Sequence, residues 1–246
     1  MRRRKTDKPI PLRVIIPNMI TSGNMLCGML SLVLAFHGHF VPASWLIYIA
    51  VIFDFMDGKM ARRLGGGSSF GMELDSLADV VSFGVAPAMI MYSVYLKGFF
   101  GVTGAVVAAF FALCGALRLA RFNVQHVDGS FQGLPIPAGG HFLVSFVVAG
   151  IYLHPAIMAI VVAAAGVLMI SSVPFGNLKA LKPGNLDRKK AFFLWAFALT
   201  LIVVLRNRAP LTGILIYIAS GFAGVDWGRW LSLENVSEED LADEEV

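Results

Sequence analysis

The sequence has few charged residues and almost no cysteine. Charged residues make up 15% of its 246 positions and hydrophobic residues 57%, a balance too apolar for an ordinary soluble domain. Its two cysteines, Cys27 and Cys114, both lie inside apolar runs, which excludes a disulfide framework and indicates small buried side chains. The basic segment Arg2–Lys5 is better explained by anionic lipid headgroups than by nucleic acid, so we expect no nucleic-acid partner.

Apolar runs of about 20 residues recur along the chain and predict an all-α, polytopic membrane protein with six to eight transmembrane helices. The candidate spans are residues 18–36, 41–60, 73–96, 100–121, 139–153, 155–173, 190–206 and 209–224. Residues 18–225 therefore form the predicted membrane domain. Residues 1–17 form a basic, amphipathic N-terminal segment, and residues 226–246 form a solvated acidic tail.

Lysine and arginine are divided unevenly between the two sides of these spans. Seventeen of the 20 fall on one side, and only Lys97, Arg206 and Arg208 fall on the other. The positive-inside rule makes the rich side cytoplasmic, so we expect a multi-pass protein of the cell (inner) membrane with both termini in the cytoplasm. No small-residue cleavage site follows the basic start, which favours retention of the first span.

Four aspartates interrupt the apolar chain within one short stretch. Asp54 and Asp57 are three residues apart near the end of the second span, and Asp75 and Asp79 are four residues apart in the third. On two helices, each spacing places both carboxylates on one face, so all four side chains can meet at a common point. Burying a carboxylate at membrane depth costs roughly 2 to 3 kcal/mol even on the lenient insertion scale, which favours a functional role.

A divalent metal site explains this cluster better than ion pairing does. Only Lys59, Arg62 and Arg63 offer nearby positive charge, whereas Mg²⁺ and Mn²⁺ prefer carboxylate oxygens and usually complete their shells with phosphate oxygens. A phosphate-bearing substrate is therefore implied, on a site that opens toward the cytoplasm. Gly58 and Gly71 remove side chains where such a substrate approaches the backbone, although small residues also permit close packing of membrane helices.

The spacing resembles the signature of the CDP-alcohol phosphotransferase family at every fixed position. The matching residues are Asp57-Gly58-x-x-Ala61-Arg62-x8-Gly71-x-x-x-Asp75-x-x-x-Asp79, with Asp54 three residues before them. Enzymes of this family are integral membrane proteins that transfer a phosphoalcohol from a CDP-linked donor to an acceptor hydroxyl and release CMP. The resemblance thus implies an all-helical membrane enzyme that uses Mg²⁺ or Mn²⁺, with two ions expected.

The resemblance also implies roles for individual residues. Asp54, Asp57 and Asp75 are metal ligands, and Asp79 is a further ligand and the general base. The residues expected to contact CDP are Asn18, Thr21, Asp54, Gly58, Ala61, Arg62, Gly71 and Asp75. A polar stripe of Asn18, Thr21 and Asn24 runs at helical spacing; it could join helices, but the resemblance places it beside the nucleotide pocket.

Four flanking segments are similar to the bacterial and archaeal membrane-type phosphatidylserine synthases. They are Pro17-Asn18-x-x-Thr21-x-x-Asn24, Ser82-Phe83-Gly84-x-Ala86-Pro87, Arg118 to Asn123, and Gly133-Leu134-Pro135-x-Pro137. This similarity implies CDP-diacylglycerol and L-serine as substrates, phosphatidylserine and CMP as products, and a homodimer among membrane lipids.

The candidates for the acceptor site include two arginines. Arg118 and Arg121 are three residues apart at the cytoplasmic end of the fourth span, where arginines commonly anchor a helix. An arginine also holds a carboxylate through two parallel hydrogen bonds, as L-serine would require. We therefore name Ser82, Arg118, Arg121 and Asn123 as acceptor-binding candidates.

Three rival functions remain open from the sequence. Relatives that use glycerol 3-phosphate or inositol phosphate share the same core signature, and a headgroup-resolved product assay separates them. Membrane prenyltransferases also hold Mg²⁺-diphosphate with aspartates but lack the framework of Gly58, Ala61, Arg62 and Gly71. A divalent-cation transporter would distribute its acids through several spans, whereas here the acids cluster at one end.

Overall fold

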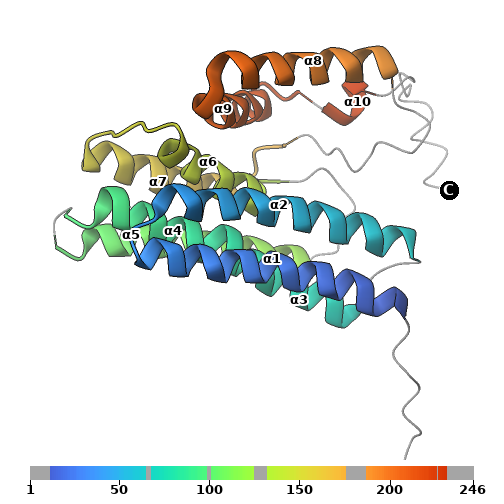
Figure 1. Cartoon of the computed structure of the whole chain (residues 1–246), viewed down its shortest axis with the longest axis horizontal. Coiled ribbons are helices and arrows are strands. Elements are labelled where there is room, and N and C mark those ends of the chain that lie inside the picture. The colour runs from blue at the N-terminus through green and yellow to red at the C-terminus, as the bar shows by residue number, and fades with distance from the viewer. Residues whose placement is uncertain are drawn as a thin grey trace, which may run out of the picture.

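The computed structural model describes residues 12–64, 68–98, 101–124, 132–175, 187–225 and 227–231. Apart from an isolated bridge between Gln132 and Pro174, these residues form helices and the loops between them (Figure 1). The elements are α1 (Leu12–Phe36), α2 (Phe40–Arg63), α3 (Ser69–Asp79), η1 (Val80–Val85), α4 (Ala86–Met91), η2 (Tyr92–Leu96), α5 (Thr103–Val124), α6 (Ile136–Val148), α7 (Pro155–Ile170), α8 (Arg188–Leu205), η4 (Arg206–Arg208), α9 (Ala209–Phe222) and α10 (Trp227–Leu231).

The all-α, polytopic membrane fold predicted from the sequence is confirmed. Five helical runs are long and apolar enough to cross a membrane: Arg13–Phe36, Phe40–Arg63, Ser69–Leu96, Thr103–Val124 and Arg188–Phe222. Two further predicted spans correspond to α6 and α7, which have 13 and 16 residues. At 1.5 Å per residue, a helix as short as α6 covers roughly 20 Å, less than the thickness of the hydrocarbon core.

The first helix begins earlier than the predicted span. α1 starts at Leu12 instead of residue 18 and contains Pro17, so part of the predicted N-terminal segment is helical. Residues 1–11 and 232–246, which hold most of the predicted basic segment and most of the acidic tail, lie outside the described residues. The division of the chain into these three parts stays a prediction.

α1 and α2 form an antiparallel pair at one side of the bundle. The Ser31 hydroxyl of α1 donates a 2.8 Å hydrogen bond to the backbone carbonyl of Ala43 on α2, and both residues are fully buried or nearly so. α1 also packs along the continuous helical run formed by α3, η1, α4 and η2. α1 is therefore in direct contact with both α2 and α3, the helices that carry the four aspartates.

The run from Ser69 to Leu96 changes helical type in the middle. η1 is a π-helical turn, in which the backbone N–H of Ala86 bonds to the carbonyl of Val81, five residues before it. Pro87 follows at once and has no N–H to donate, so a regular α-helical ladder is interrupted at this point. π-helical turns are common at functional sites because they redirect side chains within a helix.

The core lies around α6. Nine of the 13 residues of α6 are buried, because this helix packs against α2, η1, α4 and α9. α5 and α7 pair on another side of the bundle. The enclosed position of α6 explains why it can be short, since little of its surface faces lipid.

The C-terminal elements form a helical hairpin. α8 and α9 are separated by η4, where Arg206 has a positive φ of 49°. α9 packs on α6, whereas α8 has no buried residue and lies at the outside of the molecule (Figure 1). This turn divides the helical run Arg188–Phe222 into the two segments that the sequence predicts as the last two spans.

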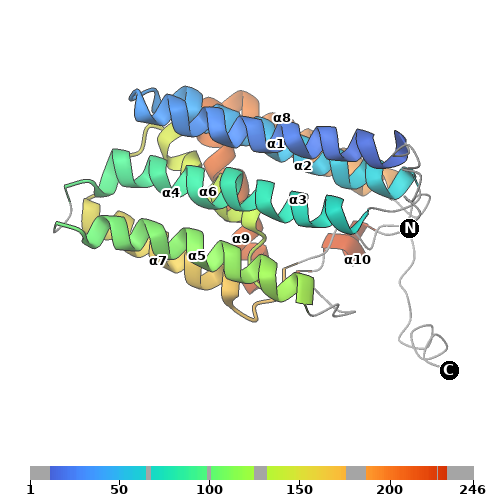
Figure 2. The ribbon, with the colours of Figure 1, turned by 90° about the horizontal axis from the view of Figure 1, so that it is seen from below.

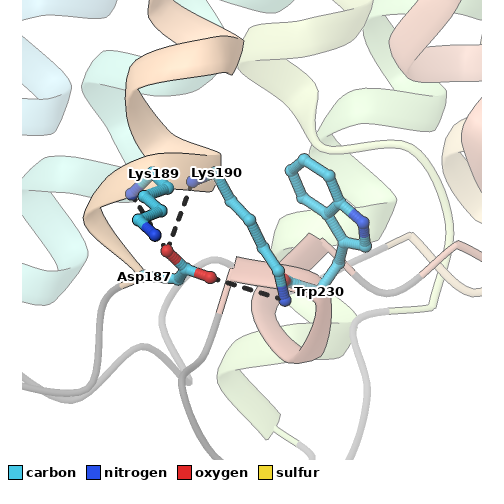
Figure 3. Close-up of polar contacts among 4 residues, drawn as sticks. All are labelled: Asp187, Lys189, Lys190 and Trp230. Atoms are coloured by element: carbon cyan, nitrogen blue, oxygen red, sulfur yellow. Dashed lines mark hydrogen bonds and ion pairs between the residues drawn. The ribbon is translucent and has the colours of Figure 1, made fainter.

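A small polar cluster joins α10 to the start of α8, and we call Asp187, Lys190 and Trp230 the clasp (Figure 3). Asp187 caps α8 by accepting from the backbone N–H groups of Lys189 and Lys190, at 2.9 and 3.3 Å. The Lys190 ammonium lies 3.9 Å from the other Asp187 oxygen, donates to the Trp230 carbonyl at 2.8 Å and lies 5.7 Å from the centre of the indole ring.

The helix ends sort into two groups. One end of the bundle, which we call the aspartate end, holds the starts of α1, α3 and α8 and the ends of α2 and α5 (Figures 1 and 2). The turns between α1 and α2, between α6 and α7, and between α8 and α9 lie at the opposite end. Basic residues that the sequence assigns to one side of the membrane, such as Arg62, Arg63 and Arg188, are thus at helix ends that lie together.

Candidate active site

Three aspartates from two helices converge at the aspartate end. Asp54 and Asp57 come from α2 and Asp75 comes from α3, and one carboxylate oxygen of each lies within 4.8 Å of the others. Asp57 is 4% exposed, and the other two are half-buried. We call these residues the carboxylate trio. The spacings of three along α2 and of four along α3 place the side chains on the facing sides of both helices, as the sequence analysis expects.

The fourth aspartate lies beside the trio. Asp79, at the end of α3, is 6% exposed and falls outside the group whose oxygens converge within 4.8 Å. It is close enough to interact electrostatically with Asp54, Asp75 and Asp57. The aspartate end therefore concentrates two buried and two half-buried carboxylates, which repel one another unless a cation or a hydrogen-bond donor balances them.

α1 supplies a hydrogen-bond donor to each aspartate pair. The Thr21 hydroxyl lies 2.9 Å from Asp57 Oδ2 and 3.1 Å from the backbone carbonyl of Pro17, and its single proton serves one acceptor at a time. Asn24 Nδ2 donates to Asp79 Oδ1 at 3.1 Å. Both side chains are buried, with 3% and 0% exposure. Asn24 is absent from the residues that the core signature marks, and its sequence signals are its place in the polar stripe and in the flanking segment Pro17 to Asn24.

The two signature glycines have different surroundings. A Cβ on Gly71 would lie 2.8 Å from Asn18 Oδ1 and 3.2 Å from Ser68 Oγ, so the missing side chain lets α1 approach the start of α3. Among the described residues, a Cβ on Gly58 would have one neighbouring atom within 4 Å, Arg62 Nη1 at 3.5 Å. Gly71 therefore permits close packing beside Asn18, while Gly58 leaves space beside the Arg62 guanidinium at the end of α2.

The acceptor-binding candidates fall at separate places around the aspartates. Asn123 of α5 donates to Ser76 Oγ at 3.0 Å, next to Asp75 in the chain. Arg121 is exposed and donates to Gln132 Oε1 at 3.3 Å. Arg118 is half-buried and lies within electrostatic range of Asp79. Arg118 therefore has a charged partner in the aspartate group.

Ser82 is also close to the aspartates, on the π-helical turn after Asp79. Its hydroxyl is fully buried and donates to the backbone carbonyl of Asn24 at 2.9 Å. Contact of this hydroxyl with an acceptor stays a prediction, as do the nucleotide contacts of Asn18, Thr21, Ala61 and Arg62. Ser82 thus links η1 to α1 at Asn24, the residue whose side chain donates to Asp79.

The donor set fits a hard divalent cation. All members of the trio offer carboxylate oxygens, the ligands that Mg²⁺ and Mn²⁺ prefer, and the trio leaves the remaining coordination positions to water or to oxygens of a phosphate. Two of the carboxylates come from one helix and one from its neighbour, so a bound cation would also offset repulsion across the helix pair.

Comparison with known proteins assigns this arrangement to a family. The chain matches the CDP-alcohol phosphatidyltransferase family over residues 14–225. The protein belongs to this family. The match runs from α1 to the end of α9. It therefore includes the four aspartates of the site and the two residues of α1 that contact them, Thr21 and Asn24.

Several relatives share one name. The chain is 36% identical over 234 residues to the CDP-diacylglycerol–serine O-phosphatidyltransferase of Helicobacter pylori, a match that covers 92% of this chain and 94% of that protein. It is 39% identical over 209 residues to the protein of the same name from Methanocaldococcus jannaschii, covering 85% and 92%. For the Bacillus subtilis protein of that name, the values are 38% over 175 residues, covering 70% and 96%.

Proposed function

We propose that this protein is a CDP-diacylglycerol–serine O-phosphatidyltransferase, which makes phosphatidylserine and CMP. The observation that carries the proposal is the combination of the carboxylate cluster with relatives of that name along most of the chain, at 36% and 39% identity. The membrane fold supports a lipid-linked donor, because the aspartates lie at one end of apolar helices where a diacylglycerol tail can stay in the bilayer while its CDP reaches the cluster.

The carboxylate trio and Asp79 would hold two Mg²⁺ or Mn²⁺ ions. Such ions neutralise a diphosphate and stabilise the departing phosphate. Asn18, Thr21, Gly58, Ala61, Arg62 and Gly71 would border the CDP. The space beside Gly58, next to the Arg62 guanidinium, supports this placement for Arg62, since a phosphate approaching there meets a positive charge without a side chain in between.

The transfer itself follows from the bonds that change. The serine hydroxyl oxygen attacks the phosphorus that carries diacylglycerol, and the bond from that phosphorus to the bridging oxygen breaks, so that CMP leaves. Asp79 takes the hydroxyl proton as general base. Arg118 would hold the serine carboxylate, helped by Arg121, Asn123 and Ser82. The electrostatic interaction between Arg118 and Asp79 supports these roles, because it places the residue that would bind the serine carboxylate near the proposed base.

We further propose that residues 18–225 form the membrane catalytic domain, that the aspartate end faces the cytoplasm and that the protein is a homodimer in the cell (inner) membrane. The orientation rests on the distribution of lysine and arginine, 17 residues against three. Cysteines introduced near residue 66 should react with an impermeant thiol reagent from the cytoplasmic side only, and those near Gly38 from the opposite side only. The reverse labelling pattern would overturn the orientation.

An acceptor panel tests the proposal. Purified protein in nanodiscs receives CDP-diacylglycerol, Mn²⁺ or Mg²⁺, and labelled L-serine, glycerol 3-phosphate or inositol phosphate in parallel, and both CMP and the lipid product are measured. We expect product from L-serine alone. Product from another acceptor would assign a different member of the family, and absence of CMP release with every acceptor would contradict a transferase.

A further inference from the structure

Asn24 is a buried residue whose role neither the signature nor the proposed chemistry explains. Its side chain is 0% exposed, and Nδ2 donates to Asp79 Oδ1. Its own Oδ1 is buried and has no hydrogen-bond partner within the described part of the chain. A buried acceptor without a partner is destabilising. The amide is therefore oriented to donate a hydrogen bond to Asp79, although its own oxygen is left without a donor among the described residues.

The backbone around Asn24 is fixed by close contact with the π-helical turn. Ser82 of η1 donates to the Asn24 carbonyl at 2.9 Å. One turn later on α1, a Cβ on Gly28 would lie 2.8 Å from the Ser82 Cα, so only glycine permits this approach. Asp79 and Ser82 are three residues apart, so Asn24 contacts the junction of α3 and η1 at two points. Its side chain donates to Asp79, and its backbone carbonyl accepts from Ser82.

The choice of a neutral donor has a physical reason. Asp79 is repelled by the three nearby carboxylates, and this repulsion favours rotation of its side chain away from them. A lysine or arginine in place of Asn24 would hold the carboxylate but would add a second positive charge near it, besides that of Arg118. An amide N–H holds one oxygen in place and leaves the charge of the group available for the reaction.

We propose that Asn24 is a positioning residue that holds Asp79 in the orientation required for the transfer step. The proposal deepens the proposed function and rests on it. Thr21, three residues earlier on the same face of α1, makes the equivalent contact with Asp57 of the carboxylate trio. α1 thus supplies two donors with different targets: Thr21 contacts a carboxylate of the trio, and Asn24 contacts Asp79, the proposed base.

Two Asn24 variants test this role in full-length protein in nanodiscs. Asn24→Ala removes the amide, and Asn24→Asp keeps its shape but replaces the donor with an acceptor. We expect both to lower kcat for CMP release by about tenfold or more, with the KM for CDP-diacylglycerol changed by less than about threefold. The affinity for Mn²⁺, measured from the electron paramagnetic resonance signal of free Mn²⁺, should fall less than in Thr21→Val, because Asp79 lies outside the trio whose carboxylate oxygens converge.

Ser31→Ala is the matched control, because Ser31 is another buried α1 residue with a hydrogen bond to a neighbouring helix. It should retain the wild-type kcat. Wild-type kcat in Asn24→Asp would overturn the proposal, because shape alone would then suffice. A kcat in Ser31→Ala as low as in Asn24→Ala would also overturn it, as would a rise in the KM for CDP-diacylglycerol at constant kcat. If CMP release requires an acceptor other than serine, the serine assignment fails, and the same comparison with that acceptor decides the role of Asn24.

Discussion

The aspartate end and the C-terminal hairpin are held together in different ways. At the aspartate end, hydrogen bonds between side chains link α1 to α2, α1 to α3 and α3 to α5, and their residues are buried or half-buried. In the hairpin, α8 has no buried residue, and the clasp that joins it to α10 consists of half-buried Asp187 and Lys190 and exposed Trp230. A buried carboxylate needs fixed partners, whereas an apolar helix in lipid needs only a continuous apolar surface.

This contrast separates two uses of charge in one membrane protein. Asp54, Asp57 and Asp75 converge where their mutual repulsion is strongest, which is unfavourable for folding and suited to a cation. Asp187 instead caps a helix and pairs with a lysine three residues away. Substitutions should therefore affect activity steeply at the aspartate end and weakly at the clasp.

The largest effect should follow loss of a trio carboxylate. Asp57→Asn or Asp75→Asn should lower CMP release by about three orders of magnitude or more, because an amide is a poor ligand and leaves the diphosphate charge uncompensated. Glu73→Gln is the control, since Glu73 is an exposed acid on the same helix as Asp75. Comparable losses in all three variants would point to misfolding or to a general effect of charge.

Asp79→Asn should come next. Removing the general base should lower kcat by roughly 10² to 10⁴, with a modest change in donor binding. The variant is checked by steady-state kinetics and by binding of CDP-diacylglycerol. A normal kcat with weakened Mn²⁺ binding would make Asp79 a ligand and not the base.

Replacement of Arg118 should act on the acceptor alone. Arg118→Ala should raise the KM for serine by about 10- to 100-fold and leave that for CDP-diacylglycerol nearly constant, because a charged hydrogen bond to the carboxylate is present before and during the reaction. Arg121→Ala should have a smaller effect, since Arg121 is exposed and bonded to Gln132. Arg208→Ala, at the opposite end, serves as the control. An unchanged serine KM in both variants would make the two arginines membrane anchors.

The smallest effect should follow a change in the clasp. Lys190→Ala loses the bond to the Trp230 carbonyl and the contact with its ring, together worth about 1 kcal/mol at an exposed site. We expect the unfolding midpoint to fall by a few degrees at most and CMP release to stay at the wild-type level. A loss of activity as large as that of Asp79→Asn would show that the hairpin takes part in the reaction.

The sequence predicts the helices and the aspartate cluster because both depend on short-range spacing. Intervals of three and four residues define one face of a helix, and runs of apolar residues define the spans. The pairing of Thr21 with Asp57 and of Asn24 with Asp79 depends instead on the rotation of α1 relative to α2 and α3. That rotation is set by contacts between distant residues, such as Gly28 with Ser82.

The sequence pattern also does not predict where each helix ends or where a helix becomes irregular. Leu12 to Pro17 is helical although Pro17, the sixth residue of α1, has no N–H to bond to the carbonyl four residues earlier, so a proline in the sequence does not mark the helix start here. The π-helical turn after Asp79 leaves no periodic signal, since all its residues are apolar or small apart from Ser82. Hydropathy therefore locates the span but not the direction of its side chains.

Withdrawal of the metal tests the central claim most directly. Wild-type protein in nanodiscs with CDP-diacylglycerol and labelled L-serine is assayed for CMP and phosphatidylserine in the same sample, first in EDTA and then after excess Mn²⁺ is restored. The carboxylate trio predicts no product in EDTA and equal amounts of CMP and phosphatidylserine once Mn²⁺ is present. Undiminished formation of both products in EDTA would contradict the account.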